Sequence, residues 1–143
     1  MQYREAIDWL YGTQLFGIKL GLDNVARLLR ESGLLPPAAR IAHVAGTNGK
    51  GSICAMLDAI CRQAGVKAGL FTSPHLISFR ERIRVDGEMI PEGDAAAGLA
   101  LIRDRIADWD PHPTFFEIAL ALALLAFPAR RGASHHPRNR DGR

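Results

Sequence analysis

The spacing of apolar residues along the chain predicts a series of short helices and strands. Near the N-terminus, Ile7, Leu10 and Tyr11 recur at helical spacing, so we expect a short amphipathic helix over residues 3–11. The glycine-bracketed segment that follows, 12–21, is typical of a loop.

A second amphipathic helix is expected over residues 23–32. Asp23 is a suitable N-cap for it, and Gly33 is placed to end it. The prolines at 36–37 then predict a linker to the central part of the chain.

The centre of the chain predicts a different architecture. An apolar strand over 41–45 runs into a glycine-rich loop at 46–52, and a helical pattern follows and ends at Gly65. A second strand is expected over 66–71. Strand, glycine loop, helix and strand in this order are the βαβ unit of a parallel sheet.

The rest of the pattern predicts a β-hairpin and two helices. Asp86-Gly87 between two short strand-like runs is a hairpin turn signal. Asp94 is expected to cap a helix that ends near Asp108, and a last helix is expected over 114–127. This last helix is apolar on nearly every side, so it requires burial all round. Without further strands to cover it, we expect part of it to face water.

Composition and charge limit the class of protein. The chain has 143 residues, 48% of them hydrophobic and 23% charged, which excludes a disordered chain and a disulfide-rich mini-protein and predicts at most one domain. The net charge is +3, but residues 130–143 alone, with five arginines and one aspartate, carry +4. The remainder carries −1 and gives no electrostatic reason to expect a nucleic-acid partner.

No targeting or membrane segment is predicted. The first residues lack the charged and apolar regions of a signal peptide, and the longest apolar run, 118–127, is far below the roughly 20 residues of a membrane span. Cys54 and Cys61 lie two helical turns apart, too far for a disulfide. We therefore expect a soluble, cytoplasmic protein with reduced cysteines.

The strongest chemical signal is the segment 46–52, GTNGKGS, between a predicted strand and a predicted helix. Polyphosphate binding needs several backbone N–H groups aimed at one point, and glycines permit the tight path that this requires. The helix start adds free N–H groups, Lys50 a positive charge, and Ser52 a hydroxyl for Mg²⁺ or a phosphate oxygen. Because Gly51 separates Lys50 from Ser52, the generic pattern is not matched to the letter, and a plain glycine turn is the alternative.

This loop variant and four further segments resemble the folylpolyglutamate synthase/dihydrofolate synthase family, within the Mur-type ATP-dependent ligases. The segments are LGLDNV at 20–25, AGTNGKGS at 45–52, TSPHL at 72–76, FRERI with the following Asp-Gly at 79–87, and TFFE at 114–117. The resemblance covers residues 3 to about 127. Cell-wall Mur ligases share the GTNGK core, but they lack the SPHL and FRERI segments.

The resemblance implies a fold and a set of site residues. The fold would be α/β, a truncated P-loop NTPase-like parallel sheet of the Mur ligase central domain with flanking helices and a short β-hairpin, over residues 1–127. Residues 128–143 would be a disordered basic tail foreign to the family. ATP phosphates would be held by Thr47, Asn48, Gly49, Lys50, Gly51 and Ser52, with Lys50 catalytic; Mg²⁺ by Ser73 and Ser52; and a pterin by Thr114, Phe115, Phe116 and Glu117.

Several of these residues have an alternative structural explanation. Ser73 is also a typical turn serine before proline. Thr114 and Glu117 match a helix capping box, which explains both without a ligand. The role of His75 stays open between site residue and structural loop residue. The arginines at 80, 82 and 84 are expected to alternate along a strand, as a solvated face or as an anion site.

The reaction implied by the resemblance joins a carboxylate, an amine and ATP. The carboxylate of dihydropteroate or a folate attacks the γ-phosphate and becomes an acyl phosphate, and the amino group of L-glutamate then displaces phosphate. ATP and Mg²⁺ would be the cofactors. The partners would be these small molecules, with neither nucleic acid nor membrane, and family members are mostly monomeric.

The chain also departs from the family. Relatives are far longer, and their further metal-binding residues and C-terminal domain have no counterpart here. The change of character at Pro128 resembles a truncated gene or an out-of-frame reading. We therefore expect an aggregation-prone fragment with impaired or no turnover. The alternatives are another Mur-type ligase, a non-catalytic ATP-binding fragment, or a tail that binds nucleic acid.

Overall fold

The structure is a computed structural model that describes residues 1–17, 21–35 and 39–132. Its helices are α1 (Tyr3–Gly12), α2 (Asp23–Glu31), α3 (Lys50–Gln63), α4 (Glu92–Ile106) and α5 (Phe115–Gly132), with 3₁₀ helices η1 (Thr13–Phe16) and η2 (Phe79–Arg82). Its strands are β1 (Gly69–Phe71), β2 (Ile83–Val85) and β3 (Glu88–Met89). The fold is therefore α/β, as expected.

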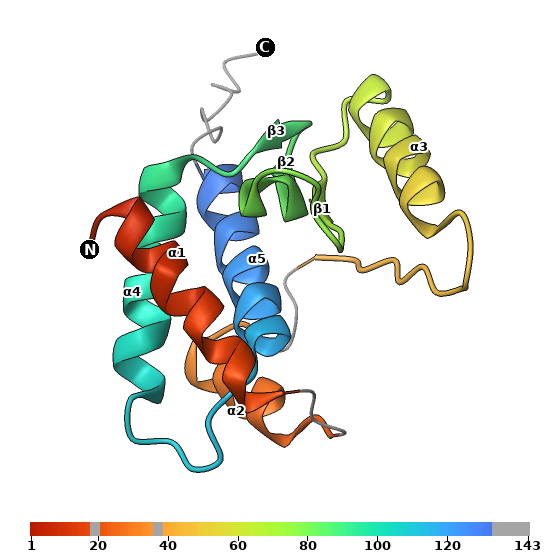
Figure 1. The fold of residues 1–143 in the computed structure, drawn as a ribbon. Coiled ribbons are helices and arrows are strands. Elements are labelled where there is room, and N and C mark those ends of the chain that lie inside the picture. The colour runs from red at the N-terminus through yellow and green to blue at the C-terminus, as the bar shows by residue number, and fades with distance from the viewer. Residues whose placement is uncertain (18–20, 36–38, 133–143) are drawn as a thin grey trace.

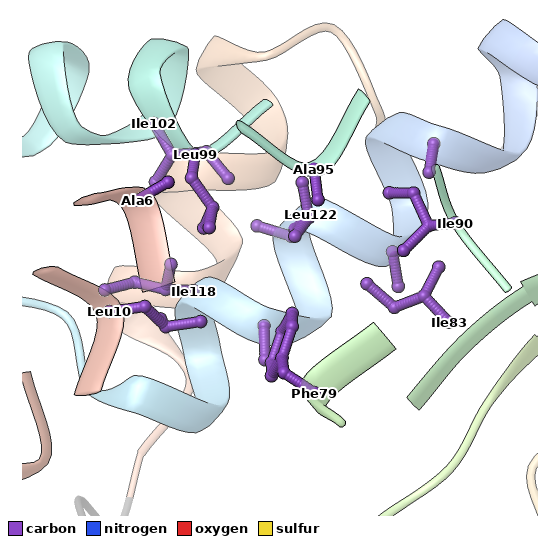
Figure 2. Close-up of a cluster of buried hydrophobic side chains, with 14 of the residues drawn as sticks. Ala6, Leu10, Phe79, Ile83, Ile90, Ala95, Leu99, Ile102, Ile118 and Leu122 are labelled. Atoms are coloured by element: carbon purple, nitrogen blue, oxygen red, sulfur yellow. The ribbon is translucent and has the colours of Figure 1, made fainter. Parts of the chain in front are cut away.

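The core lies between α1, α4 and α5, with the small sheet at one end of α5 (Figure 1). Leu10 of α1, Leu99 of α4 and Leu122 of α5 are at most 1% exposed and face one another (Figure 2). They meet because each helix places apolar residues three or four positions apart. The predicted helical face of α1 is thus confirmed.

Helix α5 is the centre of this core. Ile118, Ala119 and Ala121 are fully buried, because α1, α2, α4 and the strands β1 and β2 surround the helix. The expectation that part of this helix would face water is confirmed at Phe116, which is 50% exposed, although much of the helix is buried. The helix also runs to Gly132, past Phe127, while residues 133–143 of the expected tail lie outside the described residues.

The sheet is antiparallel, in the order β1-β2-β3. Gly69 pairs with Val85 in the first ladder, and Val85 pairs with Glu88 in the second. Asp86 and Gly87, with φ of 51° and 83°, form the turn between β2 and β3. Two successive positive φ values are what a tight hairpin turn requires, so the predicted hairpin is confirmed.

The predicted parallel βαβ unit is not seen in the described part of the chain. Residues 41–45 form no strand, and β1 covers only part of the strand expected over 66–71. A strand needs a hydrogen-bonding neighbour, and β1 pairs instead with β2. Helix α3 begins at Lys50 and is closed by Gly65, as expected, but it stands away from the helical body (Figure 1).

The apolar face of α3 is consequently exposed. Ile53, Met56, Leu57 and Ile60 expose between 43% and 63% of their surface. Both cysteines of this helix, Cys54 and Cys61, are free, as predicted. This face of α3 thus lacks a packing partner among the described residues.

Two predicted helix caps are wrong. The N-cap of α2 is Leu22, so Asp23 is its first residue, and the N-cap of α4 is Pro91, so Asp94 lies inside the first turn. In both cases the acidic side chain still faces the positive end of the helix dipole. The predicted proline linker at 36–37 lies outside the described residues. Among the described residues, none of the helices is both long and apolar enough to cross a membrane.

Candidate nucleotide and substrate site

The glycine loop leads directly into the N-terminus of α3. Gly46 and Gly49 have φ of 151° and 76°, a backbone region that favours glycine, and Lys50 is the first residue of the helix. Gly49 is the N-cap, and no side chain caps the first turn. The first N–H groups of this 14-residue helix are therefore free to receive an anion.

The predicted phosphate-binding residues, 47–52, are all exposed. Lys50 and Ser52 lie in the first turn of α3, where a charge and a hydroxyl can approach an anion held by the backbone. This donor set fits a nucleotide phosphate with Mg²⁺: uncapped N–H groups, one ammonium and one hydroxyl oxygen. The fit between this donor set and a phosphate depends on the free N–H groups at the uncapped N-terminus of α3.

Ser73 lies in the loop between β1 and η2, and its side chain is exposed. Glu81 fixes this loop, because its carboxylate accepts hydrogen bonds from the backbone N–H groups of Leu76, Ile77 and Ser78 at 3.1, 3.0 and 2.6 Å. These bonds, that of Ser78 first, hold the pKa of the Glu81 carboxyl below its usual range. The loop that carries the expected Mg²⁺ ligand is thus held by the Glu81 carboxylate, which binds backbone N–H groups of the loop.

The expected pterin segment, 114–117, borders a cavity of about 430 Å³. The cavity is lined by Gly17, Gly21, Leu22, Val25, Thr114, Phe116, Glu117 and Leu120. Phe115 does not line it: its ring stacks on that of Tyr11, with centroids 5.7 Å apart. Three of the four expected substrate residues therefore share one cavity, and none of the loop residues 46–52 contributes to it.

The capping-box explanation of Thr114 and Glu117 is confirmed. The Thr114 N–H donates to Glu117 Oε2 at 2.8 Å, and the Glu117 N–H donates to Thr114 Oγ1 at 3.4 Å. Both residues are buried and both line the cavity. Neither hydrogen bond of the cap uses Glu117 Oε1, so a structural and a binding role are compatible.

Sequence reasoning missed the contribution of Gly17 and Leu120 to the cavity. Leu22 and Val25 belong to a segment that had been singled out only for its resemblance. Glycines in a loop before a helix do not by themselves predict a cavity. This cavity forms only when α2 packs on α5, which is a contact between distant segments.

His75 is another residue whose role the sequence left open. The structure places its ring between Tyr11 and the 3₁₀ helix η2, where Tyr11 Oη lies 2.9 Å from His75 Nε2. Burial, and next the neighbouring Arg82 cation, lower the pKa of the His75 imidazole. Burial also raises the pKa of the Tyr11 phenol.

Comparison with known proteins agrees with this geometry. The chain is 42% identical over 131 residues to a probable bifunctional folylpolyglutamate synthase/dihydropteroate synthase of Haloferax volcanii, covering 89% of this chain and 16% of that protein. It is 38% identical over 129 residues to the dihydrofolate synthase/folylpolyglutamate synthase of Bacillus subtilis, covering 87% and 30%. No family model matches the chain.

Solved structures give the same result. The folylpolyglutamate synthase of Thermotoga maritima matches with a TM-score of 0.82 at 34% identity, over 90% of this chain and 31% of that one. A bifunctional folylpolyglutamate synthase/dihydrofolate synthase with Mn, AMPPNP and L-glutamate bound matches with a TM-score of 0.78 at 35% identity, over 89% and 31%.

These relatives are folylpolyglutamate and dihydrofolate synthases, which are ATP-dependent ligases. Over about 90% of its length, the chain is a homologue of the folylpolyglutamate synthase/dihydrofolate synthase family. It spans only 16% to 30% of the length of the two curated relatives described above.

Proposed function

We propose that this chain is the nucleotide- and pterin-binding part of an ATP-dependent ligase that joins L-glutamate to dihydropteroate or a folate. The observation that carries the proposal is the glycine loop at 46–49, which opens onto the uncapped N-terminus of α3 in a chain homologous to such ligases over about 90% of its length. A plain turn requires neither the free helix start nor Lys50 beside it.

The proposed reaction has two steps. A carboxylate oxygen of the acyl substrate attacks the γ-phosphorus of ATP, the bond to the β-phosphate oxygen breaks, and ADP leaves. The amino group of glutamate then attacks the carbonyl carbon of the acyl phosphate, loses a proton and expels inorganic phosphate. The protein's part in both steps is to position the reactants and to offset negative charge.

The residues of the α3 N-terminus would act on the nucleotide. The N–H groups of residues 47–52 would receive phosphate oxygens, and Lys50 would stabilise the charge that develops on the transferred phosphoryl group. Bound Mg²⁺ would neutralise phosphate charge. The hydroxyls of Ser52 and Ser73 are the groups proposed to hold it.

The cavity beside α5 would receive the pterin. The half-exposed Phe116 offers a ring face for stacking, and Glu117 offers a carboxylate oxygen to the N–H groups of the heterocycle. Thr114 lies at the same wall. The buried position of Glu117, 8% exposed, would strengthen such a hydrogen bond.

We also propose that residues 1–127 belong to an ATP-binding domain whose sheet is larger than the one described here. The apolar segment 41–45 and the exposed face of α3 would then form the parallel strand and the helix of a βαβ unit once neighbouring strands are present. Residues 128–143 would lie outside this domain.

Equilibrium titrations test the proposal directly. We expect the chain to bind MgATP and, independently, dihydropteroate, and to release no ADP above background when glutamate is added. Binding of a cell-wall precursor in place of the pterin would favour another Mur-type ligase. Failure to bind any nucleotide would contradict the proposal.

A further inference from the structure

Three arginines follow one another at alternate positions, but the structure gives them different surroundings. Arg80 Nε donates a hydrogen bond to the carbonyl oxygen of Ile90 at 2.6 Å, and an Arg84 terminal nitrogen donates to the Gly87 carbonyl at 3.5 Å. Both bonds serve the β2–β3 hairpin. The expected alternation along one strand is wrong, because residues 80 and 82 lie in η2.

Arg82 is held in a different way. Its Nε donates to Nδ1 of His75 at 2.7 Å. Its guanidinium carbon lies 5.2 Å from the ring centroid of Phe115 and 6.0 Å from that of Phe79. A planar cation is thus supported by two aromatic rings and anchored through a single nitrogen.

The hydrogen bonds around His75 define its tautomer. Since Nδ1 accepts from Arg82, the ring proton is on Nε2, and this N–H donates to Tyr11 Oη, 2.9 Å away. Tyr11 is in turn stacked on Phe115. The hydrogen bonds from Arg82 to His75 and from His75 to Tyr11 therefore fix the orientation of the guanidinium plane.

Arg82 has no acidic partner among the described residues. No carboxylate in that part of the chain lies within ion-pair distance of it, and its terminal nitrogens donate to none of the described groups. The neighbouring Glu81 is turned to backbone N–H groups instead. Two NH₂ groups in a fork geometry, partly withdrawn from water, are suited to one carboxylate.

The position of Arg82 joins the two halves of the candidate site. Its carbonyl oxygen accepts from the Thr72 N–H at 2.9 Å, next to Ser73. Its guanidinium lies over Phe115, which follows Thr114 of the cavity wall. It is thus placed between the loop expected to hold metal and the segment expected to hold the pterin.

We infer that Arg82 binds the carboxylate of the acyl substrate, an aryl carboxylate, through its two terminal nitrogens, and that His75 and Tyr11 are the positioning residues of this guanidinium. The inference rests on the proposed function and adds the residue that binds the carboxylate, which is the reacting group of the substrate. A carboxylate bound to both terminal nitrogens of Arg82 has its oxygens held in one orientation. Attack on a phosphoryl group requires such a fixed orientation.

A pair of ligands tests this assignment. The full chain is titrated with dihydropteroate and with the same pterin in which phenyl replaces the benzoate group. Arg82→Gln should weaken binding of dihydropteroate by about 10- to 100-fold and leave the carboxylate-free ligand within about twofold. Arg84→Gln, which removes an equal charge nearby, should change neither affinity.

Two further variants separate positioning from folding. Arg82→Lys keeps the charge but loses the fork, and should give an intermediate loss for dihydropteroate alone. His75→Phe leaves Arg82 in place but removes its acceptor, and should also weaken only the carboxylate-bearing ligand. A merely structural role would weaken both ligands equally.

The outcomes are distinguishable. If the wild-type chain binds neither pterin, the proposed function fails and the inference fails with it. If the wild type binds both pterins with equal affinity, or Arg82→Gln weakens both alike, the assignment of Arg82 is overturned while the pterin site stands.

Discussion

Gly98 of α4 lies against the side chain of Leu122 of α5, so closely that a Cβ atom at residue 98 would come within 2.4 Å of Leu122 Cδ1. Leu122 is 1% exposed and belongs to the hydrophobic core. The absence of a side chain at this one position therefore sets how near α4 and α5 approach, and with it the position of the segment 114–117 at the start of α5.

Gly98→Ala should lower the free energy of unfolding by about 1 kcal/mol or more, because overpacking exceeds the gain in helix propensity. Denaturant unfolding checks this. Gly93→Ala, in the same helix with open space around it, is the control and should be neutral or stabilising. In the Gly98→Ala variant, the further substitution Leu122→Val removes the atom that clashes. The losses in free energy of unfolding from the two substitutions should therefore be less than additive. A neutral Gly98→Ala would contradict the close helix contact.

Thr114 and Glu117 can be separated into their two roles. Thr114→Ala removes the helix cap and should cost about 1 kcal/mol of stability, whereas Thr114→Ser should restore most of it. Glu117→Gln keeps an oxygen that accepts from the Thr114 N–H, so stability should hold while the loss of charge weakens pterin binding by about tenfold. Unchanged pterin binding in Glu117→Gln would show that the cap is the only role of this carboxylate.

Because the apolar face of α3 is exposed, we expect it to tolerate substitution by charged residues. Replacing Met56 and Ile60, 58% and 63% exposed, by Glu and Lys should leave the free energy of unfolding unchanged and reduce aggregation and the binding of hydrophobic dyes. Leu99→Ala in the core should instead cost about 2 to 5 kcal/mol. A comparable loss from the two α3 substitutions would mean that this face is buried in solution.

Glu81 predicts a dependence of stability on pH. Its folded pKa lies below the ordinary value because backbone N–H groups favour the charged form, so its contribution is fully present above about pH 4.3 and is lost as the pH falls through the lowered value. The stability difference between wild type and Glu81→Gln should therefore shrink between pH 5 and pH 3. A difference that stays constant over this range would contradict the role of the carboxylate.

Much of the architecture was predictable from local pattern. Apolar spacing located α1, α3 and α5, and Asp86-Gly87 located the hairpin, because these elements depend on neighbours within one or two turns of chain. The glycine loop predicted an open helix start for the same reason. Element boundaries were less secure, as Asp23 and Asp94 illustrate: an acidic residue favours the cap and the first turn alike.

What the sequence could not predict depends on contacts between distant segments. The strand expected at 41–45 requires a neighbouring strand, which the described residues do not supply. The apolar pattern of α5 predicted burial, which α5 largely has, whereas the exposure of the apolar face of α3 depends on which distant segments pack against it and could not be predicted locally. The Tyr11–His75 contact joins residues 64 positions apart, and no local pattern reports it.

The central claim is that the backbone at the start of α3 binds nucleotide phosphates, and one titration tests it most directly. MgATP binding is measured for the wild type, for Lys50→Ala and for Arg40→Ala, an exposed cation in the preceding segment. We expect Lys50→Ala to weaken binding by about tenfold or more at unchanged stability, and Arg40→Ala to leave it unchanged. Equal affinity in all three proteins, or no binding in the wild type, would contradict the claim.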